Sequence, residues 1–374
     1  MAEDLPNAKQ LLLTGSTQSH SYEIPDRLDY IKLPSITKSP DGVYSAGSLE
    51  VPFDTINSIR ENMIFETVKY YKADLFLIDK APAGIHGELM RSLQYLKSNH
   101  PKTKLVFGMR DIEDDPQVTR KTWEQNGVYS LLEEVYDTIF LYGSRTVYDP
   151  VQEYGLSENM GKKIISCGYI GRDLRSVRPV QNIRDSLKMK TDKLVVVTAG
   201  GGGDGFEMID AYLEMLETAE KRSLSKFDSF VVTGPMMSEE NKNRLKRHQV
   251  GGIPLTLIDF TPEMISYLNA ADLVISMGGY NSFCEILSLH KRAIIIPRIV
   301  PRVEQLIRAN RFSALGLIRM IHPDELAPER LLEEITTEIG RRNPVRPEDA
   351  GIQMNGASNA SRAIGRLLNK ADGP

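Results

Sequence analysis

Short apolar runs alternate with longer helix-like segments along almost the whole chain, and this alternation limits the folds that the sequence can adopt. The first half holds five such runs, which we predict to be buried strands: "QLLLTG" (10–15), "DLFLID" (74–79), "KLVFGMRD" (104–111), "DTIFLYG" (137–143) and "KIISCGYIG" (163–171). The rhythm restarts at residue 193 with "KLVVVTAGGGG", "DSFVVTGP", "PLTLIDF", "ADLVISMGG" and "RAIIIP". Strands that alternate with helices form parallel sheets built from βαβ units. The sequence therefore predicts two α/β domains that face each other.

A polar stretch sets the predicted domain boundaries. The 374 residues suffice for two domains, since one domain takes roughly 100–200 residues. Residues 172–192 are polar and contain "RPVQ", so we predict a linker there, between a first domain over 1–171 and a second over 193–343. The remaining residues, 344–374, form a predicted tail, whose helix-like segment 359–368 is expected to pack back on the first domain.

Composition excludes several classes of protein. A net charge of -4 and a pI near 6.0 argue against a general nucleic-acid binder, which carries a basic face. Two cysteines, Cys167 and Cys284, are too few for a disulfide framework and fit a reducing compartment. No apolar stretch approaches the roughly 18 residues that span a bilayer. We expect a cytoplasmic protein, with peripheral contact to a membrane left open.

Four consecutive glycines follow a valine-rich run in "TAGGGGDGF" (198–206) and lead into a helical pattern. Small residues there let a phosphate approach backbone N–H groups at the start of a helix. Gly200, Gly202 and Gly205 satisfy G-x-G-x-x-G, but a dinucleotide site also needs a carboxylate after the next strand. That strand ends in "VVTGP", without a carboxylate. A flexible turn is the alternative, but four glycines cost conformational entropy that a turn alone does not require, so we favour an anion site.

A second glycine turn lies in "SMGGYNSFCE" (276–285), between an apolar run and a helix. The helix start at Gly279 offers free N–H groups and the positive end of the helix dipole, and Asn281 and Ser282 are candidate donors or caps. Glu285 lies on the same, largely apolar helix, where a carboxylate could accept two ribose hydroxyls. Periodicity alone favours the alternative, a solvated helix residue.

Two further segments complete the pattern. In "LIDFTPEM", Phe260 precedes a helix predicted to be capped by Thr261 with Pro262 at its first position. A helix start explains this segment, and a border for a nucleobase is the alternative. In "IIIPRIVPRVEQLIRAN", Glu304 and Gln305 fall in the first turn of a helix at the carboxyl edge of the predicted sheet, where open α/β sheets bind ligands.

The order of these four segments resembles the C-terminal domain of GT-B glycosyltransferases of the MurG-like kind, glycosyltransferase family 28, most clearly over residues 193–316. "DLFLIDKAPAGIHGEL" and "VFGMRDIEDDP" are similar to a branch of predicted glycosyltransferases. The resemblance implies an α/β fold of two Rossmann-like domains with parallel sheets facing across a cleft. Such families begin with a strand and a G-x-G-H-like loop, which do not precede "LLLTG". We therefore expect an incomplete N-terminal domain, and we assign no role to His20.

The resemblance also implies roles for individual residues. Glu285 would bind the ribose hydroxyls, Phe260 and Thr261 would border the base, and Gln305, with Glu304 beside it, would read the donor sugar. Five glycines of the two turns would hold the diphosphate of a nucleotide sugar: Gly201, Gly202, Gly203, Gly278 and Gly279.

The second glycine turn lacks the nearby Arg or Lys that is common in such families, and Arg298 and Arg302 are candidate substitutes. In the first domain, Asp79 and Asp111 each lie at the end of a predicted strand, so either is a candidate general base. An exposed acidic loop is the alternative.

The resemblance implies glycosyl transfer from a nucleotide sugar, a UDP-sugar, to the hydroxyl of an unidentified acceptor, with inversion. The six histidines show no metal-ligand spacing and no D-x-D motif accompanies the site, so we expect no metal and no cofactor besides the donor. A nucleotide-sugar-binding scaffold without turnover and a nucleotide-sugar epimerase remain as alternatives. Glycan, lipid and small-molecule acceptors all remain open, as does the oligomeric state.

Overall fold

The computed structural model describes residues 4–17, 19–21, 24–38, 43–172, 174–175, 177–221, 227–251, 253–341 and 344–369. They form two compact units, Met1–Tyr169 with Asn355–Pro374 and Ile170–Met354. The segment predicted as a linker contains a helix of the second unit, α7 (Val180–Ser186), whose Ile183 is fully buried. The chain from Asn355 onward belongs to the first unit.

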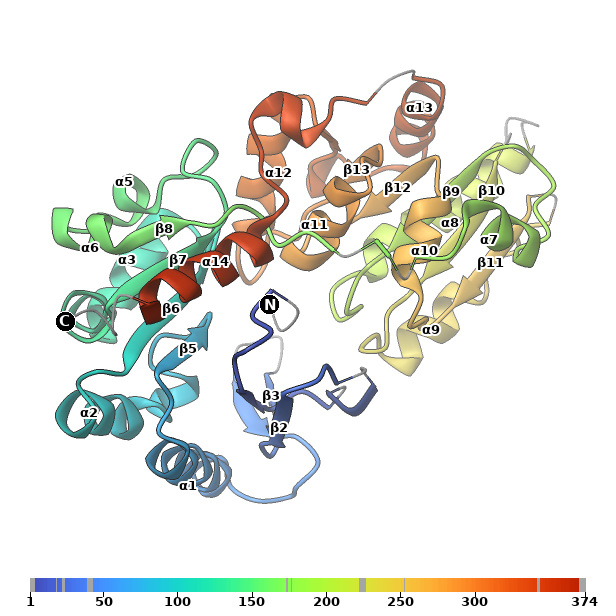
Figure 1. The fold of residues 1–374 in the computed structure, drawn as a ribbon. Helices are drawn as coiled ribbons and strands as arrows, with labels where there is room; N and C mark the ends of the chain where they lie inside the picture. Colours follow the sequence, from blue (N-terminus) through green and yellow to red (C-terminus); the bar gives the residue numbers. More distant parts are fainter. Residues whose placement is uncertain are drawn as a thin grey trace. The chain divides into compact units, whose positions relative to one another are not determined.

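The first unit contains eight strands among its described residues. β5, β6, β7 and β8 form a parallel sheet, β1 and β2 form a separate parallel pair, and β3 and β4 form a short antiparallel pair (Figure 1). Its elements are β1 (Gln10–Thr14), β2 (Leu28–Lys32), β3 (Ile36–Lys38), β4 (Tyr44–Ala46), α1 (Phe53–Tyr71), β5 (Leu75–Asp79), α2 (Met90–Asn99), β6 (Lys104–Arg110), α3 (Pro116–Gln125), α4 (Val128–Ser130), β7 (Thr138–Tyr142), α5 (Pro150–Tyr154), α6 (Glu158–Lys163), β8 (Ile164–Ser166) and α14 (Gly356–Asn369).

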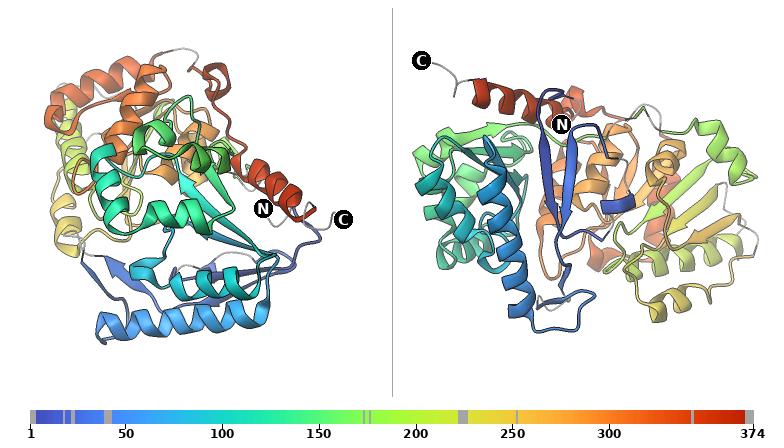
Figure 2. Two further views of the ribbon diagram at one scale, coloured as in Figure 1. Left: turned by 90° about the vertical axis from the view of Figure 1, so that its left-hand side faces the viewer. Right: turned by 60° about the horizontal axis from the view of Figure 1, so that its bottom comes forward.

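The strands of the first unit differ in how well they are covered. β6 and β7 are almost wholly buried, whereas β1 and β5, each with a single hydrogen-bonded neighbour among the described strands, are largely half-exposed. Leu12 of β1 is 49% exposed. Figure 2 shows β1 and β2 as a neighbouring pair of arrows near the start of the chain. The described parallel strands of the first unit are therefore divided between two sheets, since β1 and β2 do not pair with β5.

The second unit is built on one six-stranded parallel sheet with the order β11-β10-β9-β12-β13-β14 (Figure 1). This is the Rossmann order, in which the first strand of the unit lies between the second and the fourth. The elements are α7 (Val180–Ser186), β9 (Leu194–Thr198), α8 (Phe206–Lys221), β10 (Asp228–Val232), α9 (Glu239–Leu245), β11 (Leu255–Ile258), α10 (Met264–Ala270), β12 (Leu273–Ser276), α11 (Tyr280–Ser288), β13 (Ala293–Ile295), α12 (Glu304–Ala314), β14 (Arg319–Met320) and α13 (Pro328–Ile339).

The core of the second unit follows from the apolar character of its central strands. All residues of β9, β10 and β12 are buried, as expected for a parallel sheet covered on both faces. Val195 and Val197 of β9 belong to a core cluster with residues of α8 and α13, such as Tyr212 and Leu331. On α10, the Tyr267 ring stacks on Phe230 of β10 at a centroid distance of 4.0 Å.

Two local predictions differ from the structure. The run 163–171 was predicted as one strand, but only Ile164–Ser166 pairs with β7, because α6 extends to Lys163. The helix predicted to begin at Pro262 is α10, which begins at Met264 with Glu263 at its N-cap. The Thr261 hydroxyl accepts a hydrogen bond from the Glu263 N–H (3.2 Å), so it stabilises the turn before the helix rather than the helix start itself.

Candidate functional site

The two glycine turns of the sequence meet at one point of the second unit. They follow β9 and β12, which are adjacent in the sheet and from which the connections run in opposite directions. Ligands of open α/β sheets bind at this switch point, outside the carboxyl ends of the strands. A methyl group placed on Gly200 would lie 3.4 Å from the Ser282 hydroxyl oxygen, so the first turn lies against the first residues of α11.

Gly202 of the first turn packs closely against Gly234, which lies in the loop after β10. Gly202 has a φ of +91°, and a methyl group there would lie 2.4 Å from the Thr233 carbonyl oxygen and 2.8 Å from Gly234 Cα. Gly234, which follows β10 and has a φ of +95°, is just as restricted. Gly203 is exposed and has nothing within 4 Å of the corresponding position. Gly202 therefore shapes the turn, while Gly203 faces open space. The role of Gly234 was not predicted.

Gly201 occupies an intermediate position in this turn. Its carbonyl accepts a hydrogen bond from the Met236 N–H (2.9 Å), which ties the turn to the loop after β10. The Met236 side chain is 72% exposed. The first turn thus presents Gly201 and Gly203 at its surface, with Gly202 beneath them.

The second turn leads directly into α11. Gly278 has a φ of +79°, and a methyl group there would lie 2.7 Å from Ile295 Cγ2, so β13 leaves no room for a side chain. Gly279 is the N-cap and supplies no side-chain hydrogen bond, which leaves the first N–H groups of the helix to other partners. Asn281 is exposed and Ser282 is half-buried in this first turn of the helix.

A buried cation lies beneath the second turn. Arg308 of α12 is 1% exposed, and its Nη1 donates a hydrogen bond to the Gly278 carbonyl (3.2 Å). Its guanidinium lies 5.7 Å from the centroid of the Tyr280 ring. The positive charge adds to the helix dipole at the same place, so this edge of the sheet favours an anion. Nothing in the sequence marks Arg308, since helical periodicity does not separate it from Arg311 of the same helix.

Glu285 is not the solvated helix residue that periodicity favoured. Its side chain is 14% exposed, and Oε1 accepts a hydrogen bond from Arg172 Nε (2.8 Å). The Arg172 side chain is 52% exposed. The carboxylate is therefore held in place through Oε1, and a carboxylate accepts hydrogen bonds from hydroxyl groups at either oxygen.

Glu304 and Gln305 both bind Arg298, and Gln305 lies beside the second turn. Gln305 is 8% exposed, and its Nε2 would lie 3.8 Å from a methyl group on Gly279. Its Oε1 accepts a hydrogen bond from the Arg298 N–H (3.0 Å), and Glu304 Oε1 accepts one from Arg298 Nη2 (2.5 Å). The structure thus brings both predicted residues to the carboxyl edge of β13, close to the glycine turns.

Phe260 and Thr261 lie further along the same edge. They follow β11, which is two strands away from β9, or about 10 Å at the usual strand spacing. The Phe260 side chain is 56% exposed, which is unusual for a large apolar residue and leaves its ring free for stacking. The predicted site residues of the second unit therefore all lie at one sheet edge.

The two acidic candidates of the first unit differ in exposure. Asp79 ends β5 and its side chain is exposed. The surrounding protein partly removes water from its carboxyl group, which raises the pKa of Asp79, although the positive charges of Arg110 and Lys80 act to lower that pKa. Asp111 is 1% exposed, and its Oδ1 accepts a hydrogen bond from the Ile112 N–H (2.8 Å). Asp79 is therefore the more accessible group for a proton transfer.

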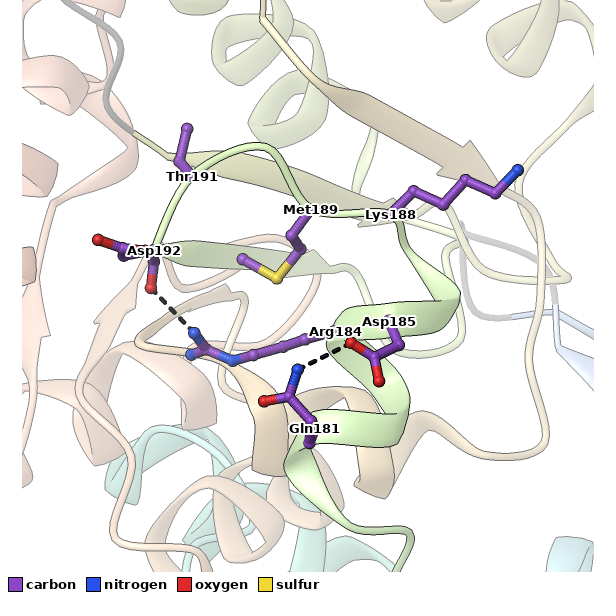
Figure 3. Close-up of a pocket in the computed structure, with 7 residues that line it drawn as sticks. All are labelled: Gln181, Arg184, Asp185, Lys188, Met189, Thr191 and Asp192. Atoms are coloured by element: carbon purple, nitrogen blue, oxygen red, sulfur yellow. Dashed lines mark hydrogen bonds between the residues drawn. The ribbon is translucent and has the colours of Figure 1, made fainter.

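A cavity of ≈ 410 Å³ lies elsewhere in the second unit (Figure 3). Arg184 crosses it and donates hydrogen bonds to the Asp192 carbonyl (2.9 Å) and to Asp272 Oδ2 (2.8 Å), residues that precede β9 and β12. The cavity therefore lies at the amino ends of the strands, opposite the glycine turns, and we assign no role in the candidate site to its lining residues: Gln181, Arg184, Asp185, Lys188, Met189, Thr191 and Asp192.

The described residues contain neither a cluster of metal-ligating side chains nor a helix that could span a membrane. Among them, no group of three or more His, Cys, Asp or Glu side chains could hold a metal ion. None of the helices in the described part of the chain combines the length and apolar character needed to cross a bilayer.

Residues 194–362 match the glycosyltransferase family 28 C-terminal domain, which confirms the resemblance predicted from the sequence. The chain is 32% identical over 112 residues to the UDP-N-acetylglucosamine--N-acetylmuramyl-(pentapeptide) pyrophosphoryl-undecaprenol N-acetylglucosamine transferase of Shouchella clausii, which is 29% of this chain and 30% of that protein. The chain thus matches less than a third of that relative's length.

Solved structures share the fold at low sequence identity. The calicheamicin glycosyltransferase CalG4 superposes with a TM-score of 0.56 at 12% identity, over 98% of this chain and 100% of that one. The UDP-GlcNAc 2-epimerase from Neisseria meningitidis, bound to UDP-GlcNAc, superposes with a TM-score of 0.56 at 16% identity, over 86% and 83%. The fold is therefore GT-B, which transferases and epimerases share, so the fold alone does not distinguish the two reactions.

Proposed function

We propose that this chain is a glycosyltransferase that moves a sugar from a UDP-sugar to a hydroxyl group of an acceptor. The observation that carries the proposal is the meeting of the two glycine turns at the switch point, where Gly200 lies against Ser282. Glu285, held by Arg172, follows within the same helix. Anion-binding turns with a carboxylate beside them suit a nucleoside diphosphate, whose phosphates need N–H donors and whose ribose needs an acceptor.

Each group of the site then has a task. The N–H groups at the start of α11 and the buried charge of Arg308 stabilise the negative charge that develops on the leaving diphosphate. Glu285 Oε2 accepts the ribose hydroxyls, and the exposed ring of Phe260 borders the base. Gln305 and Glu304 bind hydroxyl groups of the donor sugar. The acceptor hydroxyl attacks the anomeric carbon with inversion while a carboxylate, for which Asp79 is our candidate, takes its proton.

The match to a family 28 domain supports this reading of the second unit. The fold shared with UDP-GlcNAc 2-epimerase supports an epimerase as the second candidate. The two reactions leave different products. A transferase yields UDP and a glycosylated acceptor, whereas an epimerase yields a UDP-sugar that differs from its substrate in the configuration at one carbon. A scaffold binds the donor and produces neither. We further propose a cytoplasmic protein in peripheral contact with a membrane, and a reaction without a metal or a cofactor.

The first experiment is calorimetric titration of UDP and UDP-GlcNAc into the chain and into a Glu285→Ala variant. Loss of hydrogen bonds to a charged acceptor costs about 1.5–3 kcal/mol, so we expect affinity to fall roughly tenfold or more. Glu338→Ala is the matched control, because Glu338 is also an ion-paired helix residue and is 8% exposed. Equal affinities in the chain and in Glu285→Ala would refute the ribose assignment. Absence of binding to the unaltered chain would refute a UDP donor.

A further inference from the structure

The guanidinium of Arg298 joins the first glycine turn to the start of α12. Its Nη1 donates a hydrogen bond to Asp204 Oδ2 (2.9 Å), and its Nη2 donates one to Glu304 Oε1 (2.5 Å). Asp204 belongs to the turn after β9, and Arg298 itself follows β13. One cation is thus held by two carboxylates, although 94 residues separate it from one of them.

The same arginine is close to the second glycine turn. Its backbone N–H is bound by Gln305 Oε1 (3.0 Å), and Gln305 Nε2 would lie 3.8 Å from a methyl group on Gly279. Arg298 therefore contacts an element of the first turn with its side chain and a neighbour of the second turn with its backbone. A diphosphate bound at both turns would carry its charge beside this guanidinium.

The two carboxylates differ in how firmly they hold the arginine. Glu304 and Arg298 are 17% and 21% exposed, whereas Asp204 is 41% exposed. Arg298 Nε and Glu304 Oε2 are buried without a hydrogen-bond partner among the described residues. An exposed ion pair contributes little, about 0–1 kcal/mol, and another anion can replace it. Asp204 is therefore the replaceable partner and Glu304 the fixed one.

We propose that Arg298 is the cation that binds the donor diphosphate, and that Asp204 occupies its Nη1 until a phosphate oxygen replaces it. This inference rests on the proposed UDP-sugar donor and adds to it a specific residue and an exchange of anions. Guanidinium groups bind phosphate oxygens through the same N–H donors that bind carboxylates. The exchange also explains why the glycine-rich turn carries a carboxylate where a phosphate is expected to approach: Asp204 neutralises the cation in the free protein.

The test is titration of UDP, and of uridine, into the chain and four variants. Arg298→Met removes the guanidinium and retains an unbranched side chain. We expect this variant to bind UDP roughly tenfold to a hundredfold more weakly and to bind uridine as before. Arg298→Lys keeps the charge and should recover part of the loss. Asp204→Asn frees the cation, so UDP should bind up to about fivefold more tightly. Arg330→Met is the matched control, since Arg330 is likewise held by two carboxylates, Glu333 and Glu334, and it should change neither affinity.

The outcomes separate this inference from the proposed function. If the chain binds UDP and Arg298→Met binds it equally well, the Arg298 assignment is wrong while the UDP donor stands. If Asp204→Asn weakens UDP binding instead, Asp204 supports the turn and the anion exchange is wrong. If uridine loses as much affinity as UDP in Arg298→Met, the variant has disturbed the site as a whole and the specific role in diphosphate binding is refuted. If the chain binds neither UDP nor uridine, the proposed donor fails, and this inference fails with it.

Discussion

Replacing Gly202 with alanine tests whether the first glycine turn is shaped by packing against the loop after β10. The left-handed φ of +91° costs an alanine about 1–2 kcal/mol. The new methyl group, 2.4 Å from the Thr233 carbonyl oxygen, forces the backbone to move, and overpacking of this kind costs about 1–3 kcal/mol. We therefore expect Gly202→Ala to lower the free energy of unfolding by roughly 2–5 kcal/mol. With a urea dependence of about 1–3 kcal/mol per molar, the urea midpoint falls by about 0.7 M or more.

Gly203→Ala is the control in the same turn, because nothing lies within 4 Å of its added methyl group. We expect it to leave the midpoint unchanged or slightly raised, since alanine restricts the unfolded chain. Far-UV circular dichroism follows the unfolding of both units. The fluorescence of Trp123, the single tryptophan, reports on the first unit, so the midpoint measured by fluorescence should change less in Gly202→Ala. Equal urea midpoints for Gly202→Ala and Gly203→Ala would refute the packing argument.

Two further predictions concern the first unit. Arg60→Met should lower the free energy of unfolding by about 3–5 kcal/mol in a denaturant titration, because it leaves the Glu88 carboxylate, 5% exposed and bound by Arg60 Nε at 2.6 Å, buried without its partner; a loss below 1 kcal/mol would show that water reaches the pair. Because the folded protein raises the pKa of Asp79 above its ordinary value of 3.8, the charged carboxylate destabilises the fold at neutral pH, so Asp79→Asn should be more stable than the unaltered chain at pH 7, and the difference should vanish as the pH falls below 3.8. Thermal unfolding between pH 3 and pH 8 measures the second effect, and a difference that grows toward acid pH would contradict it.

Strand and helix positions in the second unit follow from local sequence patterns. The valine-rich run of β9 and the apolar run of β12 are short, rich in β-branched residues and followed by glycines, which is enough to predict buried strands at these places. The chain order of the two glycine turns, and of the segments around Phe260 and Gln305, is also local information, and it carried the family resemblance. The short parallel pair β1–β2 is only partly predictable, since β2 lies among polar residues.

The sequence alone indicates most of the buried strands, the positions of the glycine turns, and the kind of ligand that such turns suit, but not the strands β2, β3, β4 and β14. The tertiary structure alone decided which groups meet. Strand order puts β9 beside β12 and so brings Gly200 to Ser282. The pairing of β9 with β10 on its other side reveals that Gly234 must be a glycine. The contacts of Glu285 with Arg172 and of Arg298 with Asp204 span 113 and 94 residues, so no local period marks them. Patterns of a few residues report which face of a helix or strand is buried, whereas the charges of a site are brought together by the packing of whole elements.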